Sequence, residues 1–213
     1  MRSITLDIET TGLSFLEGHK IVEIGCVELL NNFPSGKTWQ RYINPKIPMP
    51  EEAFKIHGLS EEFLSTKPVF SDIIDDFLNF IKDSDLIIHN APFDIGFLDS
   101  ELTLSSSSNQ SMDSVCTVLD TLILAREKHP GQRNNLDALC KRYGIDNTQR
   151  DLHGALLDAE ILAEVFLEMN GGRQQFMNLI SNTEKQEIKT ELTRQKYSKK
   201  IYEITEQEKK SHK

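Results

Sequence analysis

Alternating apolar and polar residues mark the first predicted strand. Over residues 3–9, three aliphatic side chains alternate with Thr5, Asp7 and Glu9, and a period of two is typical of a β-strand. Asp7 and Glu9 therefore share one face, roughly 6.5 to 7 Å apart along the strand. At that spacing two carboxylates can converge on one cation or on an adjacent pair of cations.

A helical period follows near the end of the patterned region, over residues 154–169. One stripe of this helix is apolar and the opposite stripe is acidic: the apolar residues are Ile161, Leu162, Val165 and Met169, and the acids are Glu160, Glu164 and Glu168. At about 100° per residue, Asp158 lies about 20° from Val165 and from Met169, so we predict that it points inward. His153 is about 140° from Asp158 in helical phase. We therefore place it in the loop or first turn before the helix, exposed to solvent.

The same two periods predict the other elements. Further strands are expected near residues 21–30, 37–43, 85–89 and 114–117, and further helices near residues 69–82, 92–103, 118–128 and 135–142. Three prolines keep residues 44–50 out of regular structure. Three opening strands followed by helices and short strands indicate an α/β fold, a mixed sheet of about five strands flanked by helices.

Asp94 follows the strand predicted at residues 85–89 and lies in the first turn of a helix near Pro92. An acid at a helix N-terminus is favoured by the helix dipole without any function, so this position alone leaves its role open. Asp7, Glu9 and Asp158 are different, because inward-pointing acids persist only beside a positive partner. Ligands that are all oxygen favour hard divalent ions such as Mg²⁺ or Mn²⁺ over zinc.

Length and composition agree with one domain plus an appendage. The chain has 213 residues and three cysteines without paired spacing, and we see no secretory signal. No apolar run approaches the roughly 20 residues that span a bilayer. We therefore expect a soluble protein of the reducing cytoplasm that does not bind a membrane.

Three segments together resemble a known family. They are Leu6-Asp7-Ile8-Glu9-Thr10-Thr11-Gly12-Leu13, residues 89–97 (His-Asn-Ala-Pro-Phe-Asp-Ile-Gly-Phe) and residues 152–159 (Leu-His-Gly-Ala-Leu-Leu-Asp-Ala). In this order they resemble the DEDDh-type 3′–5′ exonucleases, and within them the proofreading ε subunits of bacterial DNA polymerase III. Residues 17–25, 56–59 and 135–140 are similar to the ε subunits in particular. The one departure is Ile8, where threonine is usual, and its side chain points away from the acids.

This resemblance implies a ribonuclease H-like fold and a two-metal mechanism. Two divalent cations, Mg²⁺ or Mn²⁺, would be held by Asp7, Glu9 and Asp158, with Asp7 bridging and Asp94 contributing directly or through water. His153 would accept a proton from the attacking water, and the products would be nucleoside 5′-monophosphates.

Substrate contacts are also implied. Asp7, Glu9 and Asp158 would meet the substrate through the metals, and Glu52 and His57 match positions that contact the terminal nucleotide in the family. Without the resemblance Glu52 is a helix-start acid and His57 a turn residue. We expect Thr10 to offer its backbone or hydroxyl to the terminal sugar.

The net charge is unevenly distributed. From Gly172 onward there are ten Lys or Arg and six Asp or Glu, a balance of +4. Because the net charge of the whole chain is −9, the preceding 171 residues carry −13. So acidic a domain is unlike a protein that wraps duplex DNA through many phosphate contacts. The acidic domain fits a single-stranded or frayed DNA 3′ end that is held through metals and delivered by a partner. The resemblance implies that this partner is the polymerase catalytic subunit, and it leaves a small accessory subunit open.

Residues 172–213 form a polar, basic tail, and we expect the exonuclease domain to be residues 1–171. The tail has too few apolar residues to build a core, so a solvated extension and a tether that binds the polymerase both stay open. Residues 174–179 also resemble the short peptides that dock into sliding clamps, which makes Gln174, Met177 and Leu179 candidate clamp contacts.

Two other functions use the same residues. A 3′–5′ exoribonuclease that trims RNA would need the same five catalytic positions. A non-catalytic polymerase-binding module is disfavoured, because such a module has no reason to bury uncompensated acids.

Overall fold

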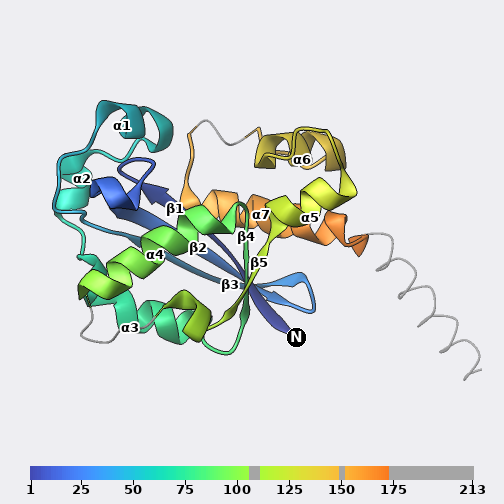
Figure 1. Ribbon diagram of the computed structural model, residues 1–213, viewed down its shortest axis with the longest axis horizontal. Coiled ribbons are helices and arrows are strands. Elements are labelled where there is room, and N and C mark those ends of the chain that lie inside the picture. Colours follow the sequence, from blue (N-terminus) through green and yellow to red (C-terminus); the bar gives the residue numbers. More distant parts are fainter. Residues whose placement is uncertain (106–110, 149–151, 173–213) are drawn as a thin grey trace, which may run out of the picture. The chain divides into compact units, whose positions relative to one another are not determined.

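A five-stranded mixed sheet lies at the centre of the computed structural model, which describes residues 1–105, 111–148 and 152–172 (Figure 1). The strands are β1 (Arg2–Thr10), β2 (Ile21–Leu30), β3 (Phe33–Tyr42), β4 (Asp85–Ile88) and β5 (Thr117–Asp120), in the order β3-β2-β1-β4-β5. The first three strands pair antiparallel, and β1–β4 and β4–β5 pair parallel. The predicted mixed α/β sheet is confirmed.

Seven α-helices and two short 3₁₀ turns connect or cover the described strands. The helices are α1 (Glu51–His57), α2 (Glu61–Ser65), α3 (Phe70–Ile81), α4 (Ala91–Ser105), α5 (Thr121–Lys128), α6 (Leu136–Tyr143) and α7 (Ala155–Met169), and the turns are η1 (Phe15–Glu17) and η2 (Met112–Ser114). The sequence patterns predicted α3 to α7. They did not predict the extent of α1 or α2, because five to seven residues are too few to show a helical period, although the sequence marks Glu52 as an acid at a helix start.

One predicted boundary was wrong. The fifth strand is residues 117–120, where we expected the next helix to begin, and not residues 114–117. Parallel pairing with β4 decides this, since Asp85 pairs with Thr117 and Ile88 pairs with Asp120. Asp120 then ends the strand and caps α5, because its carboxylate accepts from the Leu122 N–H at 2.8 Å.

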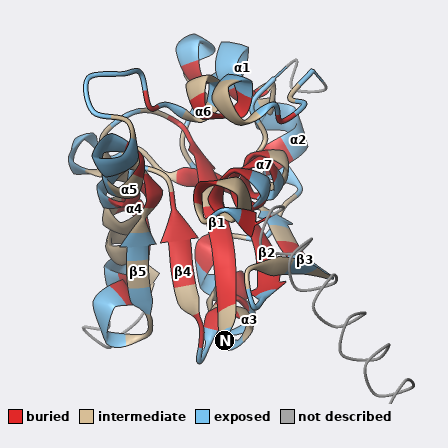
Figure 2. Cartoon of the chain, turned by 90° about the vertical axis from the view of Figure 1, so that its right-hand side faces the viewer, coloured by how far each residue is buried: buried red, intermediate tan, exposed pale blue. Residues whose placement is uncertain are grey.

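The two faces of β1 contact different layers. The buried aliphatic residues Ile4, Leu6 and Ile8 belong to the same cluster as Phe77 of α3 and Phe97 of α4. The opposite face of the sheet contacts α7, and the Thr5 hydroxyl donates to the Ala159 carbonyl at 2.8 Å. Figure 2 shows β1 and β4 as buried strands inside these layers. Asp7 and Glu9 therefore lie on the strand face that looks toward α7.

Helix α7 is fixed on two sides. Ala159, Ala163 and Phe166 pack against residues of β2 and β4, and the small alanines allow close approach. Ile161, Val165 and Met169 pack against α5 and α6 instead. Of the predicted acidic stripe, Glu160 and Glu164 are exposed as expected, whereas Glu168 is half-buried.

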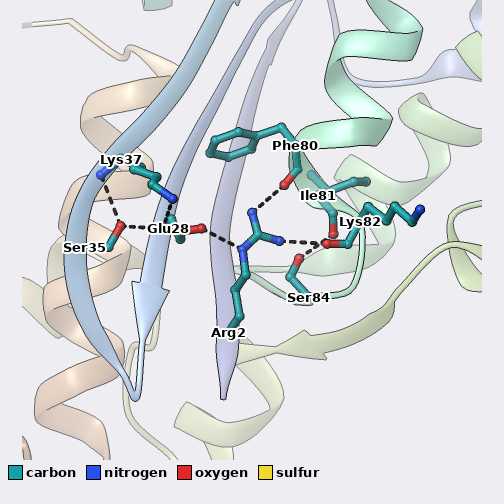
Figure 3. Close-up of polar contacts among 8 residues, drawn as sticks. All are labelled: Arg2, Glu28, Ser35, Lys37, Phe80, Ile81, Lys82 and Ser84. Atoms are coloured by element: carbon teal, nitrogen blue, oxygen red, sulfur yellow. Dashed lines mark hydrogen bonds and ion pairs between the residues drawn. The ribbon is translucent and has the colours of Figure 1, made fainter.

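An ion-pair network holds the start of β1, at the end of the strand opposite Glu9 (Figure 3). Arg2 Nε donates to Glu28 Oε1 at 2.6 Å, and its two terminal nitrogens donate to the carbonyls of Phe80 and Lys82. The Ser35 hydroxyl also donates to Glu28 at 2.7 Å. Arg2 first, and then Ser35, lower the pKa of Glu28. The network joins β1, β2 and the end of α3 and has no part in the site described below.

Residues Met1–Gly172 form one compact unit. No helix in the described ranges has both the length and the apolar character needed to cross a membrane. The predicted tail beyond Gly172, with Gln174, Met177 and Leu179, lies outside the described residues, as do residues 106–110 and 149–151. The division into an exonuclease domain and a tail stays a prediction.

Candidate functional site

Glu9, His153 and Asp158 converge at the end of β1, although 149 positions separate the first from the last in sequence. Among the described residues, each offers a ligand atom that lies within 4.8 Å of the other two. His153 Nδ1 is 3.3 Å from Asp158 Oδ2. Asp158 is 3% and Glu9 8% exposed, whereas the His153 side chain is 47% exposed. The site thus combines buried acids with an imidazole open to solvent.

Asp7 lies on the same strand face but is not part of this three-residue cluster. It is partly exposed and pairs across the sheet with Gly25, whereas Glu9 pairs with Glu23. Its predicted role as a bridging ligand therefore stays a prediction.

Asp94 reaches the site from the other layer, in the first turn of α4. It is 3% exposed, and burial raises the pKa of its carboxyl well above the usual range. The charge of Asp120 raises this pKa further, and backbone interactions with Asp94 itself and with Ile8 oppose the shift. Ile8 lies between Asp7 and Glu9 on β1, so Asp94 contacts the strand that carries these acids, although it is not part of the three-residue cluster.

These residues fit a divalent cation. The Asp94 carboxyl, which burial drives toward the neutral form, regains its charge when a cation binds next to it. The donor atoms are mainly carboxylate oxygens, with one imidazole nitrogen at the exposed side. Hard divalent cations prefer such oxygen ligands.

A cavity of about 420 Å³ adjoins Glu9. The three residues predicted to bind the terminal nucleotide, Thr10, Glu52 and His57, all line it. Most of the remaining lining is apolar, and it includes Ile8, Leu13, Pro50, Ala53, Ile56 and Phe93. A pocket with an apolar wall and a few convergent polar groups beside the acids is of the kind that binds small ligands.

His57 is held in a defined state in this cavity. Its Nδ1 accepts from the Leu59 N–H at 3.0 Å, which assigns the ring proton to Nε2. Burial lowers the pKa of His57, a backbone interaction with Thr10 opposes that shift, and Nε2 has no hydrogen-bond partner among the described residues. A neutral His57 therefore presents Nε2–H as a donor. The Thr10 hydroxyl donates to the Gly12 carbonyl at 2.6 Å, so its backbone is the better candidate for a sugar contact.

His19 was missed by the sequence reasoning, which assigned it no role. Its ring packs over Gly12, where any Cβ would overlap it, and it also lines the cavity. His19 Nδ1 and the Thr11 hydroxyl are 3.1 Å apart. The available signal was its place inside the ε-like residues 17–25.

Glu23 was also missed as an individual residue. It is 2% exposed, lies opposite Glu9 in the sheet and accepts from Gln40 Nε2 at 2.7 Å. Burial raises the pKa of Glu23, whereas Gln40 and the backbones of Ala155 and Leu156 lower it. Helix α7 begins after Gly154, which has no side chain to cap it. The Glu23 carboxyl therefore interacts with the backbone at the helix N-terminus and positions the turn that carries Asp158.

Gly25 allows this contact between β2 and α7. A Cβ at residue 25 would overlap backbone atoms of Ala155 and Leu156, so we expect Gly25→Ala to displace the start of α7. The expected cost is about 1–3 kcal/mol of unfolding free energy, together with a fall in kcat because Asp158 moves. Gly154→Ala is the control, since a Cβ there meets nothing within 4 Å. Chemical denaturation and single-turnover cleavage of both variants test this, and equal behaviour of the two would contradict it.

The loop that carries His153 is attached to α1. The His153 N–H donates to the Ile56 carbonyl at 3.0 Å. Gly58, at a φ of +71°, ends α1 next to Leu152. Helix α1, whose extent the sequence did not predict, therefore positions both the cavity and the catalytic histidine candidate.

The family model described as "Exonuclease" matches residues 4–166. Among solved structures, an exonuclease X in complex with 5′ overhanging duplex DNA is 26% identical, with a TM-score of 0.61 over 78% of this chain and 89% of that one. The nuclease domain of 3′hExo, a DEDDh family member bound to rAMP, shares the fold at 17% identity, with a TM-score of 0.69 over 80% of this chain and 92% of its own. The fold is thus the expected ribonuclease H-like form, and the protein is an exonuclease of a class that depends on divalent metals.

Curated relatives specify the family further. The DNA polymerase III subunit epsilon of Rickettsia conorii is 52% identical over 86% of this chain and 80% of its own length. The protein of the same name from Salmonella typhimurium is 52% identical over 81% of this chain and 72% of its own. The chain belongs to the DNA polymerase III ε-subunit family.

Proposed function

We propose that this protein removes nucleotides from the 3′ end of DNA as the proofreading subunit of a replicative polymerase. The observation that carries the proposal is the convergence of Glu9, Asp158 and His153 next to the cavity lined by Thr10, Glu52 and His57. Chemistry at a strand end needs a reacting centre and a pocket for one nucleotide side by side. The names of the relatives support DNA synthesis as the setting.

Asp7, Glu9 and Asp158 are the residues that would hold two divalent cations, Mg²⁺ or Mn²⁺, with Asp94 contributing directly or through water. When bound, the cations supply activation of a water and stabilisation of negative charge on the scissile phosphate and the leaving oxygen. Asp94 and Asp158 are buried on different elements, α4 and α7. The protein therefore fixes the ligand positions before substrate arrives.

His153 is the proposed general base. Asp158 lies 3.3 Å from its Nδ1 and orients the ring, so Nε2 is the nitrogen that accepts the proton of the attacking water. The oxygen of this water forms a bond to the phosphorus while the bond between the phosphorus and the 3′ oxygen of the preceding nucleotide breaks, and that 3′ oxygen takes a proton from solvent. The released product is a nucleoside 5′-monophosphate.

The terminal nucleotide would occupy the cavity beside Glu9. His57 Nε2–H and the Thr10 backbone offer hydrogen bonds to it, and Glu52 can accept one from a sugar hydroxyl. The apolar lining packs against the base without hydrogen bonds that would distinguish one base from another. A site of this kind takes any unpaired 3′ end, so preference for mismatches follows from fraying.

We infer a DNA strand end and the polymerase catalytic subunit as partners, in the cytoplasm. The basic tail is proposed as the segment that binds the polymerase. Clamp binding through Gln174, Met177 and Leu179, and a small accessory subunit, stay predictions.

The decisive experiment compares a primer with a mismatched 3′ end, the matched primer and an RNA of the same sequence. We expect release of 5′-monophosphates that needs added Mg²⁺ or Mn²⁺, stops with EDTA and is fastest on the mismatched DNA end. Faster cleavage of RNA than of single-stranded DNA would favour the exoribonuclease. No cleavage of any substrate would leave a polymerase-binding module.

A further inference from the structure

Basic residues gather in one short region of an otherwise acidic domain. Residues 83–125 contain no Lys or Arg at all, whereas residues 126–142 contain five cations and two acids. The five cations are Arg126, Lys128, Arg133, Lys141 and Arg142. They lie on α5, α6 and the connection between them, which follow β5 at the edge of the sheet. A local positive charge in a domain of strong negative charge indicates an anionic ligand at this place.

The same region contains a hollow of about 600 Å³. It is lined by polar side chains from the ends of β4 and α6 and by one cation, namely His89, Asn90, Arg126, Gln132, Asn134 and Asn135. His89 and Asn90 belong to the turn that leads directly into Asp94. The Asn90 N–H donates to Asp120 at 3.1 Å, and Asp94 follows Asn90 within the first turn of α4. The hollow therefore adjoins the acidic site.

Hydrogen bonds make the wall of this hollow rigid. His89 Nδ1 and the Thr121 hydroxyl are 3.0 Å apart. Asn134 is buried and donates to the carbonyls of His129 and Gln132, while Arg142 donates to Asn134 Oδ1 at 3.1 Å and to the Arg133 carbonyl at 2.8 Å. Arg142 is thus used to hold the loop. Pre-formed walls reduce the entropy that a ligand must lose on binding.

Arg126 is the cation of the hollow that remains available to a ligand. It is exposed, and no ion pair joins it to an acid in the described part of the chain. A guanidinium binds phosphate oxygens with two parallel donors. Gln132, on the connection before α6, adds a neutral amide.

The hollow and the nucleotide cavity lie on opposite sides of the acids. The cavity is formed by the end of β1 with α1, and the hollow by the turn after β4 with α5 and the loop that leads into α6. If the terminal nucleotide fills the cavity and the scissile phosphate lies at the acids, the rest of the strand leaves toward the hollow. We propose that this hollow binds a backbone phosphate of single-stranded DNA on the 5′ side of the scissile bond, with Arg126 as the charged contact. This inference rests on the proposed function.

The test compares two substrates on Arg126→Ala and the unchanged protein. One is a single-stranded DNA of ten nucleotides, and the other is the p-nitrophenyl ester of thymidine 5′-monophosphate, which has no upstream phosphate. We expect KM for the oligonucleotide to rise about 10- to 150-fold, as for loss of one charged hydrogen bond, with kcat little changed. The slope of log(kcat/KM) against log salt concentration should become shallower by about 0.7. KM for the ester should keep its value.

Arg126→Lys and Lys37→Ala are the matched variants. Arg126→Lys keeps the charge and should retain the salt dependence. Lys37→Ala removes an exposed cation on β3, at the other edge of the sheet, and should leave KM for both substrates unchanged. An equal rise of KM for both substrates would overturn the phosphate site. An unchanged KM for the oligonucleotide would also overturn it and would favour a protein ligand. Fluorescence anisotropy of a labelled oligonucleotide gives the same comparison without catalysis. If the unchanged protein binds the oligonucleotide but cleaves neither substrate, the proposed function fails and the binding result still decides the site.

Discussion

Asp158→Asn is expected to abolish cleavage and, in the absence of metal, to make the protein more stable. The side chain keeps its size, but the buried site loses a negative charge that lies close to Glu9 and acts on Glu23. Removing like-charge repulsion should raise the unfolding temperature in EDTA by about 2 to 4 °C for each kcal/mol relieved. Divalent metal should then stabilise the variant much less than the unchanged protein, because a ligand is lost.

Thermal unfolding with EDTA and with Mn²⁺ measures the metal-free stability and the stabilisation by metal, and single-turnover cleavage measures the activity. Glu160→Gln is the matched control, since Glu160 is an exposed acid on the same helix and its loss should leave all three unchanged. A destabilised but active Asp158→Asn variant would mean that Asp158 serves the fold and not the metal site.

His153→Ala is expected to lower kcat by about 10² to 10⁴-fold, the usual contribution of a general base. Stabilisation by metal should persist, at about 5 to 10 °C in unfolding temperature when the metal is at 100 times its dissociation constant. Both kcat and stabilisation by metal are measured because a ring nitrogen of His153 lies within 4.8 Å of ligand atoms of Glu9 and Asp158, close enough for His153 to act as a metal ligand itself. The geometry alone is compatible with both roles.

Single-turnover rates and unfolding temperatures with and without Mn²⁺ separate these roles. Loss of both activity and metal stabilisation would make His153 a ligand. Loss of activity alone supports the base. His129→Ala is a suitable control, because His129 is a partner of Tyr143 on α6 and lies outside the acidic cluster.

The sequence determined the longer elements and the direction of their side chains. Strand alternation put Asp7 and Glu9 on one face, and helical phase turned Asp158 inward, which the structure shows as a buried side chain. These are local properties, because period and phase depend only on neighbouring residues. Short elements without a period, such as α1, and the pairing that sets β5 were not accessible in this way.

Only the tertiary structure decided which of these residues meet. His153 is held by the carbonyl of Ile56, α7 is seated on Gly25 and faces Glu23, and His19 covers Gly12. Each contact joins segments from different elements, so no pattern within one segment could reveal it. The hollow around Arg126 has the same origin, since its lining comes from β4, α5 and the loop before α6. The sequence supplied chemically suitable residues, and long-range packing brought them within reach of one another.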